Sequence, residues 1–216
     1  MDTSPLYTKE IIVAVEKGSV LPVMEYFYTI QGEGFHSGVP SYFVRLAGCD
    51  VGCVFCDVKD SWEKENHPLY SIEKIVEWVS STKATKVIIT GGEPLMHKLD
   101  RLCTLFHARK IDCHIETSGA YPYSGFWDWF TLSPKKRKLP LDENYAKADE
   151  LKVVISRAND FLFAQEQSEK VSSECKLYLQ PEWSKESEIL NQIIQYVKEH
   201  PKWNISLQTH KYMNIP

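Results

Sequence analysis

Three cysteines within eight residues give this chain its most specific chemical signal. Cys49, Cys53 and Cys56 follow the spacing C-x₃-C-x₂-C, with no fourth cysteine nearby. A structural zinc ion is normally held by four ligands, whereas a 4Fe–4S cube bound by three thiolates keeps one iron free for a cofactor or substrate. The run therefore predicts an open iron–sulfur site. The alternative is a zinc ion closed by His67 or by a distant cysteine.

A second segment with chemical meaning contains two adjacent glycines, in Thr90-Gly91-Gly92-Glu93-Pro94. Two glycines in a row expose backbone N–H and C=O groups without side-chain obstruction, so the backbone can approach a ligand closely. Alone, the pair is a weak turn signal. Together with the three cysteines it becomes a strong indication of a bound cofactor.

The third segment combines polar side chains with extended backbone. Gln31 and Glu33 lie two residues apart, so their side chains point the same way and suit the donor and acceptor edge of a heterocycle. Arg45 stands in an otherwise apolar predicted strand and needs an anionic partner. Its planar guanidinium matches a ligand carboxylate in bidentate geometry, and an internal salt bridge to a protein carboxylate is the alternative.

Short β-rich runs and helix-period runs alternate from Ser41 onward and must position these segments. Strands are expected at residues 41–46, 86–90, 112–117, 129–133, 151–155, 176–180 and 204–209. Helices are expected after a Ser71 N-cap, over residues 99–106, and from a Ser184 cap up to Pro201. This alternation implies parallel β-α units. About six such units suit an α/β fold of the partial parallel (β/α)6 barrel type better than a closed eight-fold barrel.

The unusual residues fall at the same ends of these predicted strands. The cysteines follow the first strand, the two glycines follow the second, and Glu116 closes the third. Ser133 ends the fourth strand, and His210 follows the last. Active sites of parallel barrels lie at the C-terminal ends of the strands, so one rim is expected to gather all of them.

Length and charge limit the domain organisation and the partners. The 216 residues suit a single domain, in which residues 1–22 form an N-terminal extension and residues 23–40 a strand and Gly-rich loop. A net charge of -4 argues against a nucleic-acid partner. The basic run Lys135–Lys138 is most typical of a solvated loop.

The sequence also indicates a compartment. No stretch approaches the roughly 20 apolar residues that span a bilayer, and the N-terminus lacks a signal-peptide core. We therefore expect a cytoplasmic protein without membrane contact. Cysteines there are rarely in disulfides, and Cys103, Cys113 and Cys175 are predicted to be small core residues because they fall in apolar periodic segments.

The cysteine run and the Gly-Gly-Glu-Pro motif resemble the radical S-adenosylmethionine superfamily. The resemblance implies a 4Fe–4S cluster on Cys49, Cys53 and Cys56, whose free iron binds the amino and carboxylate groups of S-adenosylmethionine. Phe55 would pack near the adenine of that cofactor. The implied cofactor-binding residues are Phe55, Gly91, Gly92, Glu93, Glu116, Ser118, Ser133, Pro134 and Lys135.

The order of the motifs is similar to one family of that superfamily, the 7-carboxy-7-deazaguanine synthases. Over residues 24–216 the chain carries Q-G-E-G, the cysteine run, T-G-G-E-P, E-T-S-G, S-P-K and a Q-x-H-K tail in the expected order. The resemblance implies radical-mediated ring contraction of 6-carboxy-5,6,7,8-tetrahydropterin to 7-carboxy-7-deazaguanine plus ammonia, in queuosine and deazapurine biosynthesis. It also implies a homodimer and a reducing partner such as flavodoxin or ferredoxin. The implied substrate-binding residues are Ile30, Gln31, Gly32, Glu33, Arg45, Thr90, His210 and the carboxylate of Pro216.

One position departs from the family pattern. Family members commonly carry Asp-Thr after the last cysteine, where the threonine hydroxyl ligates Mg²⁺. Here Asp57 is followed by Val58, whose isopropyl group cannot ligate a hard cation. The sequence leaves two alternatives, a magnesium site held through Asp57, substrate oxygens and water, or an enzyme that dispenses with the metal.

Two other functions share part of this pattern. An activating enzyme that makes a glycyl radical on a partner protein would carry the same cysteine run and Gly-Gly-Glu-Pro motif. Gln31, Glu33 and Arg45 favour a small heterocyclic acid over a protein substrate. A non-catalytic zinc-binding interaction module would hold zinc and show no visible absorbance.

Overall fold

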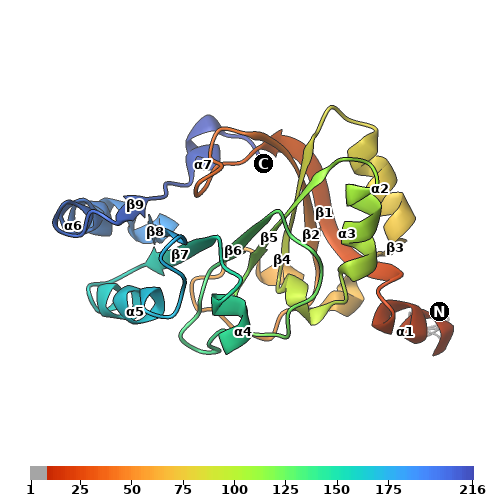
Figure 1. Ribbon diagram of the computed structural model, residues 1–216, viewed down its shortest axis with the longest axis horizontal. Coiled ribbons are helices and arrows are strands. Elements are labelled where there is room, and N and C mark those ends of the chain that lie inside the picture. The colour runs from red at the N-terminus through yellow and green to blue at the C-terminus, as the bar shows by residue number, and fades with distance from the viewer. Residues whose placement is uncertain (1–8) are drawn as a thin grey trace.

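One mixed sheet organises residues 9–216, the part of the chain that the computed structural model describes (Figure 1). Its strand order is β3-β1-β2-β4-β5-β6-β7-β8-β9, so the sheet curves but does not close (Figure 1). The strands are β1 (Val20–Ile30), β2 (Pro40–Leu46), β3 (Leu69–Ser71), β4 (Lys86–Gly91), β5 (Asp112–Thr117), β6 (Trp129–Leu132), β7 (Glu150–Ile155), β8 (Lys176–Pro181) and β9 (Trp203–Ile205). From β2 to β9 neighbouring strands are parallel, while β1 is antiparallel to β2 and β3. The expected partial parallel barrel is confirmed.

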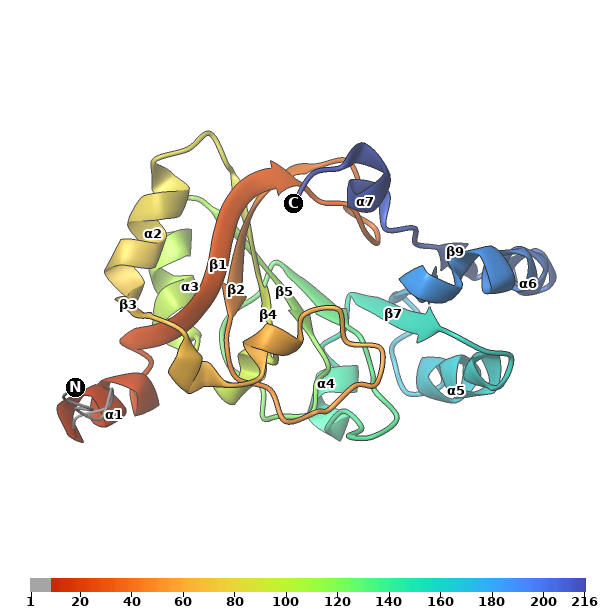
Figure 2. The same cartoon turned by 180° about the vertical axis from the view of Figure 1, so that it is seen from behind.

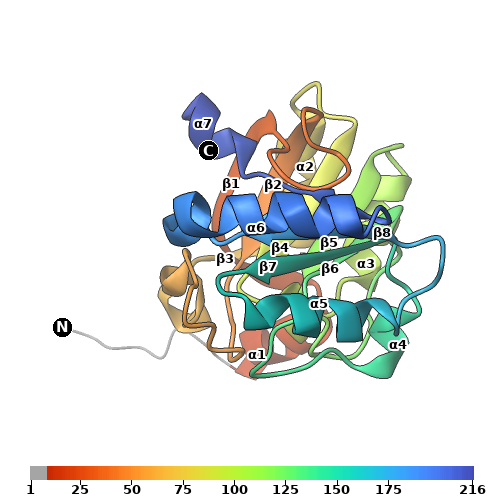
Figure 3. The ribbon, with the colours of Figure 1, turned by 90° about the vertical axis from the view of Figure 1, so that its left-hand side faces the viewer.

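Helices cover the outer face of the sheet. α2 (Ile72–Ser80) and α3 (Asp100–His107) pack outside the first half of the sheet, and α5 (Asn159–Ser168) and α6 (Glu186–Glu199) outside β7 to β9 (Figures 2 and 3). The shorter helices are α1 (Lys9–Glu16), α4 (Asp142–Tyr145) and α7 (Thr209–Met213). None of the helices in residues 9–216 has both the length and the apolar character needed to cross a membrane.

The capping predictions had different outcomes at the two helices. Ser71 caps α2 as predicted, because its Oγ accepts a hydrogen bond from the backbone N–H of Lys74 at 3.2 Å. Ser184 does not cap α6. It lies in a 3₁₀ turn whose own cap is Glu182, which accepts from the Ser184 N–H at 3.0 Å, and α6 begins only at Glu186.

The strands alternate between an apolar outer face and a polar inner face. On β7, Leu151 and Val153 belong to the hydrophobic core under the helices, while Lys152 points the other way and borders a cavity inside the barrel. On β2, Val44 likewise belongs to the core and Arg45 borders the cavity. The same period sets the cavity-facing side chains of the other central strands, which include Thr90, Glu116 and Gln180. Burial on the outer face thus fixes which polar groups face inward.

The ends of the sheet differ from the sequence prediction. β9 stops at Ile205 instead of residue 209, because the N–H and the Oγ1 of Thr209 both donate to the carbonyl of Gly32 at 2.9 Å and start α7 there. β1 begins at Val20, inside the segment expected to be an extension. The first eight residues of that extension lie outside the described part of the chain.

Candidate active site

One cavity of about 540 Å³ opens among the C-terminal ends of the parallel strands. All of the predicted substrate-binding residues border it, and so do the three cysteines. Among the predicted cofactor-binding residues, only Glu93 and Pro134 do not border it. Ligand sites of proteins commonly have this size. The structure therefore brings the predicted site together at one rim, while the role of each residue stays a prediction.

Two basic side chains anchor the cysteine loop, residues 49–56. Arg137 Nη1 donates to the carbonyl of Gly52 at 2.9 Å, and Lys138 Nζ lies 2.9 Å from both carboxylate oxygens of Asp50. The φ of Gly52 is 66°, in the left-handed region that glycine adopts without strain. Lys136 and Arg137 are exposed, as the prediction of a solvated loop over Lys135–Lys138 requires, but the run also holds the cysteine loop in place, a role that the sequence did not indicate.

The donor set of the cysteine loop fits a cluster better than a single ion. Its three thiols are free and border the cavity. Zinc ligands lie about 2.0–2.3 Å from the metal and hence within roughly 4.6 Å of one another. Among residues 9–216, the group of potential metal ligands whose atoms all lie within 4.8 Å of one another consists of His107, Cys113 and Asp128. It includes none of the three cysteines of the loop. His67 points elsewhere, because its Nε2 lies 2.7 Å from the backbone oxygen of Asp60.

The two glycines dock the next strand end against the start of the cysteine loop. The N–H of Gly92 donates to Leu46 O and that of Glu93 to Gly48 O, both at 2.9 Å. A Cβ on Gly91 would lie 2.2 Å from Leu46 O, and one on Gly92 would lie 2.5 Å from Gly48 O. Both positions need glycine because the backbone of residues 46 and 48 lies where a Cβ would be. The absence of a side chain also leaves room for a ligand.

Glu93 organises the neighbouring strand end from inside the protein. It is buried, and its Oε1 accepts from the Leu95 N–H at 2.9 Å and from Thr117 Oγ1 at 2.5 Å. Its Oε2 accepts from both the N–H and the hydroxyl of Ser118. The carboxylate thus fixes Ser118, which does border the cavity, and contacts protein groups where the sequence predicted a cofactor contact.

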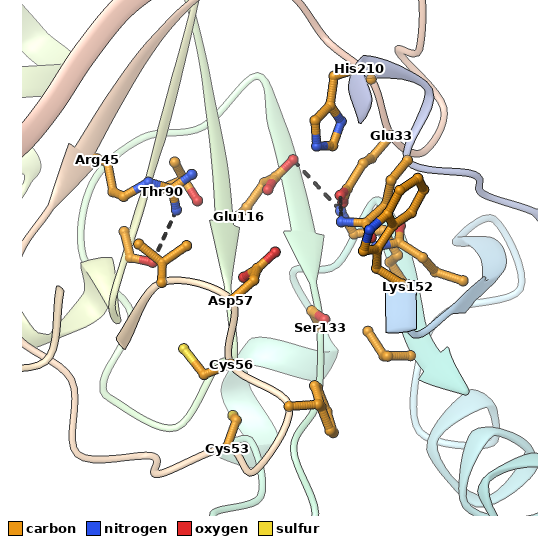
Figure 4. Close-up of a pocket in the computed structure, with 18 of the residues that line it drawn as sticks. Glu33, Arg45, Cys53, Cys56, Asp57, Thr90, Glu116, Ser133, Lys152 and His210 are labelled. Atoms are coloured by element: carbon orange, nitrogen blue, oxygen red, sulfur yellow. Dashed lines mark hydrogen bonds and ion pairs between the residues drawn. The ribbon is translucent and has the colours of Figure 1, made fainter. Parts of the chain in front are cut away.

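A charged network forms one wall of the cavity (Figure 4). Glu33 accepts hydrogen bonds from Lys152 Nζ and, at 2.8 Å, from Gln208 Nε2. Gln31 donates to Glu116 Oε1 at 2.9 Å, and Lys152 Nζ lies 3.7 Å from the same oxygen. Burial alone would raise the pKa of Glu33, but the Lys152 ammonium and the two hydrogen bonds outweigh it and lower the pKa to about 2. Glu33 is therefore an anion at neutral pH.

Arg45 and Thr90 lie on the opposite side of the cavity from Glu33 and Lys152 (Figure 4). They are paired across β2 and β4. The Nε of Arg45 lies 2.6 Å from Oε1 of Glu25, and its Nη1 lies 3.5 Å from Gly91 O. The internal salt bridge that the sequence left as an alternative therefore exists, and the guanidinium still borders the cavity.

The segment from α7 to Pro216 closes the rim next to the end of β1 (Figure 2). His210 borders the cavity, and burial lowers its pKa, so the ring is neutral. A Cβ on Gly32 would lie 2.3 Å from His210 Nδ1, so that glycine is needed for α7 to dock. Thr29 Oγ1 donates to Pro216 O at 3.2 Å, which holds the tail against the strand.

Ser133 and Lys135 line the part of the cavity nearest Cys53. Lys135 Nζ donates to the carbonyl of Ser133 at 2.8 Å and to its Oγ at 2.6 Å. Burial lowers the pKa of Lys135. The pair places a donor-rich patch beside the cysteine loop, where the sequence predicts the nucleotide part of S-adenosylmethionine.

Comparison with known proteins adds independent observations on this site. The family model of the radical SAM superfamily matches residues 44–130, which contain the cysteine loop and the glycine pair. The 7-carboxy-7-deazaguanine synthase of Flavobacterium psychrophilum is 55% identical over 98% of this chain and 100% of its own length. The chain belongs to the 7-carboxy-7-deazaguanine synthase family. Proteins of that name from Synechocystis sp. and Escherichia coli K12 are 46% and 33% identical over 90% of this chain, and 93% and 98% of their own.

A solved structure supports the same family. The crystal structure of QueE from Escherichia coli superposes with a TM-score of 0.81, at 28% sequence identity, over 95% of this chain and 99% of that one. The radical SAM domain implies a 4Fe–4S cluster and S-adenosylmethionine, and the three free thiols at the cavity fit the cluster.

Val58, where the sequence resemblance predicted a threonine ligand for Mg²⁺, carries no hydroxyl. Val58 borders the cavity beside Asp57. Lys211 Nζ lies 3.6 Å from Oδ2 of Asp57, whose side chain is 64% exposed. The Lys211 ammonium therefore partly balances the charge of the Asp57 carboxylate.

Lys152 is a cavity residue that the sequence analysis did not single out. It is 4% exposed, borders the cavity and contacts Glu33. The available signal was the alternation of charged and apolar residues from Glu150, just before the predicted strand 151–155, to Lys152 within it, which places two charges on one face of the strand. The sequence analysis placed Gln208 in the Q-x-H-K tail without giving it a role. Its contact with Glu33 depends on the turn that ends β9.

Proposed function

We propose that this protein is a radical S-adenosylmethionine carbon–nitrogen lyase that converts 6-carboxy-5,6,7,8-tetrahydropterin to 7-carboxy-7-deazaguanine and releases ammonia. One observation carries the proposal. The cysteine loop, the glycine pair and a polar wall suited to a heterocyclic acid all border the same cavity. The near-full-length identity to proteins named 7-carboxy-7-deazaguanine synthase supports the same reaction.

The protein's part in this reaction is to bind and orient the pterin. The chemistry that the bound cluster and S-adenosylmethionine supply is one-electron cleavage of a carbon–sulfur bond and abstraction of hydrogen from C6 of the pterin. Arg45 binds the substrate carboxylate, because Glu25 occupies its Nε and Gly91 O only one N–H of Nη1, which leaves the other Nη N–H groups for a charged acceptor. Thr90, its neighbour across the strands, adds a hydroxyl at the same side.

The pyrimidine edge of the pterin meets the opposite wall. Glu33 is an anion and accepts N–H donors, since its two oxygens offer about four acceptor positions and its protein partners occupy two. Gln31 uses one N–H toward Glu116 and accepts from the Glu33 N–H at 3.0 Å, so its remaining N–H and lone pair can read the same edge. The bound substrate would then extend across the cavity, with its carboxylate at Arg45 and its pyrimidine edge at Glu33.

Shielding from water and from stray hydrogen donors is the other task of the protein. The rings of Phe27 and Phe43, 5.5 Å apart and stacked, line the cavity. Trp62 and Trp183 border it elsewhere. The docked tail, with Pro216 against Thr29, covers the rim next to β1. A reactive carbon radical needs this kind of enclosure because any nearby donor would quench it.

The finer assignments belong to the same proposal. A reducing protein such as flavodoxin or ferredoxin would deliver the electron at the tip of the cysteine loop, where Val54 is 82% exposed. The homodimer and the cytoplasmic location expected from the sequence are proposed on family resemblance and composition. Mg²⁺ is proposed to bind weakly, because Val58 offers no oxygen.

A reconstitution experiment tests the function. The anaerobically purified protein is incubated with S-adenosylmethionine, a reductant and 6-carboxy-5,6,7,8-tetrahydropterin, and products are identified by mass spectrometry. We expect 7-carboxy-7-deazaguanine, ammonia and iron in the protein. An active cluster that cleaves S-adenosylmethionine without converting the pterin would favour a glycyl-radical activating enzyme. A colourless protein that contains zinc in place of iron would contradict the proposal and favour the non-catalytic zinc-binding interaction module.

A further inference from the structure

Lys152 is a buried cation that none of the roles above uses. It stands on β7, and its side chain is 5% exposed. Its ammonium donates a hydrogen bond to Glu33, from the loop after β1, and lies 3.7 Å from Glu116 at the end of β5. A single lysine therefore links carboxylates from two separated parts of the sheet, and both carboxylates border the cavity (Figure 4).

The electrostatics make these groups an ion network. Burial alone would lower the pKa of Lys152, but the carboxylates of Glu116, Glu33 and Glu150 outweigh it and raise the pKa. Burying an ammonium is costly unless it is paired and hydrogen-bonded, and here the carboxylates supply that pairing. In return, the ammonium holds the Glu33 carboxyl in its ionised form.

We propose that Lys152 is a positioning residue for the pterin: it fixes Glu33 as an oriented anion and sets its place relative to Glu116, so that Glu33 can accept the two adjacent N–H donors of an aminopyrimidine edge. This inference rests on the proposed function, because it names how that substrate class is recognised. A carboxylate with free lone pairs matches two parallel N–H groups, whereas a protonated carboxyl would present a donor and lose one of these contacts.

The surrounding charges show what loss of Lys152 would do. The charged or titratable groups that face the Glu33–Lys152 pair are Glu116, Glu150, Lys135 and His210, and Lys211 in turn faces His210. Without the lysine, two buried or half-buried glutamates would remain around Glu33, and no cation would stay in contact with its carboxylate among the described residues. Like charges at such a site raise a carboxyl pKa, so Glu33 would take up a proton closer to neutral pH.

Lys152→Met removes the charge while keeping the length of the side chain. Lys86→Met is the matched control, because Lys86 on β4 is also buried, hydrogen-bonds to His114 Nε2 at 2.6 Å and does not border the cavity. For both variants, iron content, affinity for S-adenosylmethionine, and kcat and KM for the carboxypterin are measured from pH 6 to 8.5.

The positioning role predicts a specific set of results. Lys152→Met keeps iron and S-adenosylmethionine affinity within about twofold, and its KM for the carboxypterin rises at least tenfold at pH 7. That KM falls as the pH rises, since Glu33 must now lose a proton, whereas the wild-type KM and that of Lys86→Met stay flat. Combining Lys152→Met with Glu33→Gln adds little to the loss from Glu33→Gln alone, because each change disables the same Glu33–Lys152 pair.

Other outcomes overturn the inference. A wild-type, pH-independent KM in Lys152→Met would leave the lysine a structural ion pair only. If that variant does not fold, Lys152→Arg decides: we expect a KM raised at least threefold without pH dependence, and a wild-type KM would contradict the role. Absence of pterin conversion by wild type and by Lys86→Met alike would refute the proposed function, and this inference with it.

Discussion

Arg45 Nε lies 2.6 Å from Glu25 Oε1, so the arginine that borders the cavity is oriented by a carboxylate on the neighbouring strand. Glu25 is on β1 and Arg45 on β2, and the two residues are paired across the antiparallel strands. The ion pair takes Nε and Gly91 O takes one N–H of Nη1, which leaves the other Nη N–H groups for a ligand. A structural contact and a binding role thus use different atoms of one side chain.

Arg45→Lys is expected to weaken carboxypterin binding on the order of 1.5–3 kcal/mol, the usual worth of a hydrogen bond to a charged group. An ammonium can pair with Glu25 or with the substrate, but cannot do both in bidentate geometry. Isothermal titration with the pterin and, separately, with S-adenosylmethionine measures the effect. Glu25→Gln is the control for orientation and should cost less. An equal loss of affinity for S-adenosylmethionine would argue against the assigned role.

Each of Cys49→Ala, Cys53→Ala and Cys56→Ala should abolish cluster binding and 5′-deoxyadenosine formation, because two thiolates cannot retain the cube. Iron analysis and the visible absorbance spectrum report on the cluster. The controls are Cys103→Ala, Cys113→Ala and Cys175→Ala, whose side chains are buried in the hydrophobic core. These should keep the cluster. Full iron content in any of the loop variants would contradict the ligand assignment.

Gly32→Ala should disturb the docking of α7, since its Cβ would lie 2.3 Å from His210 Nδ1 and 2.7 Å from the His210 backbone nitrogen. We expect a loss of about 1–3 kcal/mol in unfolding free energy and a higher KM for the pterin. Gly38→Ala is the comparison, because its φ of 91° strains any side chain but no atom lies within 4 Å of the added Cβ. An unchanged KM in Gly32→Ala would mean that α7 does not help to form the site.

Acid should destabilise the fold through His114. Burial, reinforced by Lys86 and His36, lowers the pKa of His114 to about 3, whereas an unfolded histidine titrates near 6.5. The unfolded state therefore binds the extra proton first, and stability falls as the pH drops below about 6.5. Between pH 6.5 and 5 this residue accounts for a loss on the order of 2 kcal/mol.

Anaerobic urea unfolding at pH 7 and pH 5, followed by circular dichroism, measures this loss in wild type and in His114→Gln. The variant should lose less stability on acidification. Part of its remaining pH dependence comes from His36, His97 and His210, whose pKa values are also lowered by burial. Identical losses in both proteins would show that His114 is not the group that takes up the proton.

Val58→Thr supplies the hydroxyl that the sequence resemblance predicted at this position and should tighten Mg²⁺ activation. In wild type, chelator-treated enzyme is expected to respond weakly to added Mg²⁺, because Asp57 is shared with Lys211 and Val58 offers no ligand. Activity against Mg²⁺ concentration compares the two proteins, with Val58→Ala as a control without a hydroxyl. Saturable, tight activation of wild type that Val58→Thr does not change would make this side chain irrelevant.

The sequence alone determined the six central parallel strands, the motifs and the rim on which they meet, but not β3 or the ends of β1 and β9. Short runs rich in β-branched and aromatic residues located β2, β4, β5, β6, β7 and β8 to within one residue at each end, because strands buried in a sheet favour these residues. The cysteine spacing and the glycine pair are local patterns, and parallel strands carry them to one end of the barrel without further information.

Only the tertiary structure decided which charges meet across the cavity. The Glu33–Lys152 contact joins residues 119 apart in the chain, and Gln208 reaches Glu33 only because Thr209 is captured by Gly32 and ends β9 early. Arg137 and Lys138 hold the cysteine loop from 85 and 88 residues away. Periodicity reports which face a side chain takes, but the curvature of the sheet sets which inward side chains come within hydrogen-bonding distance.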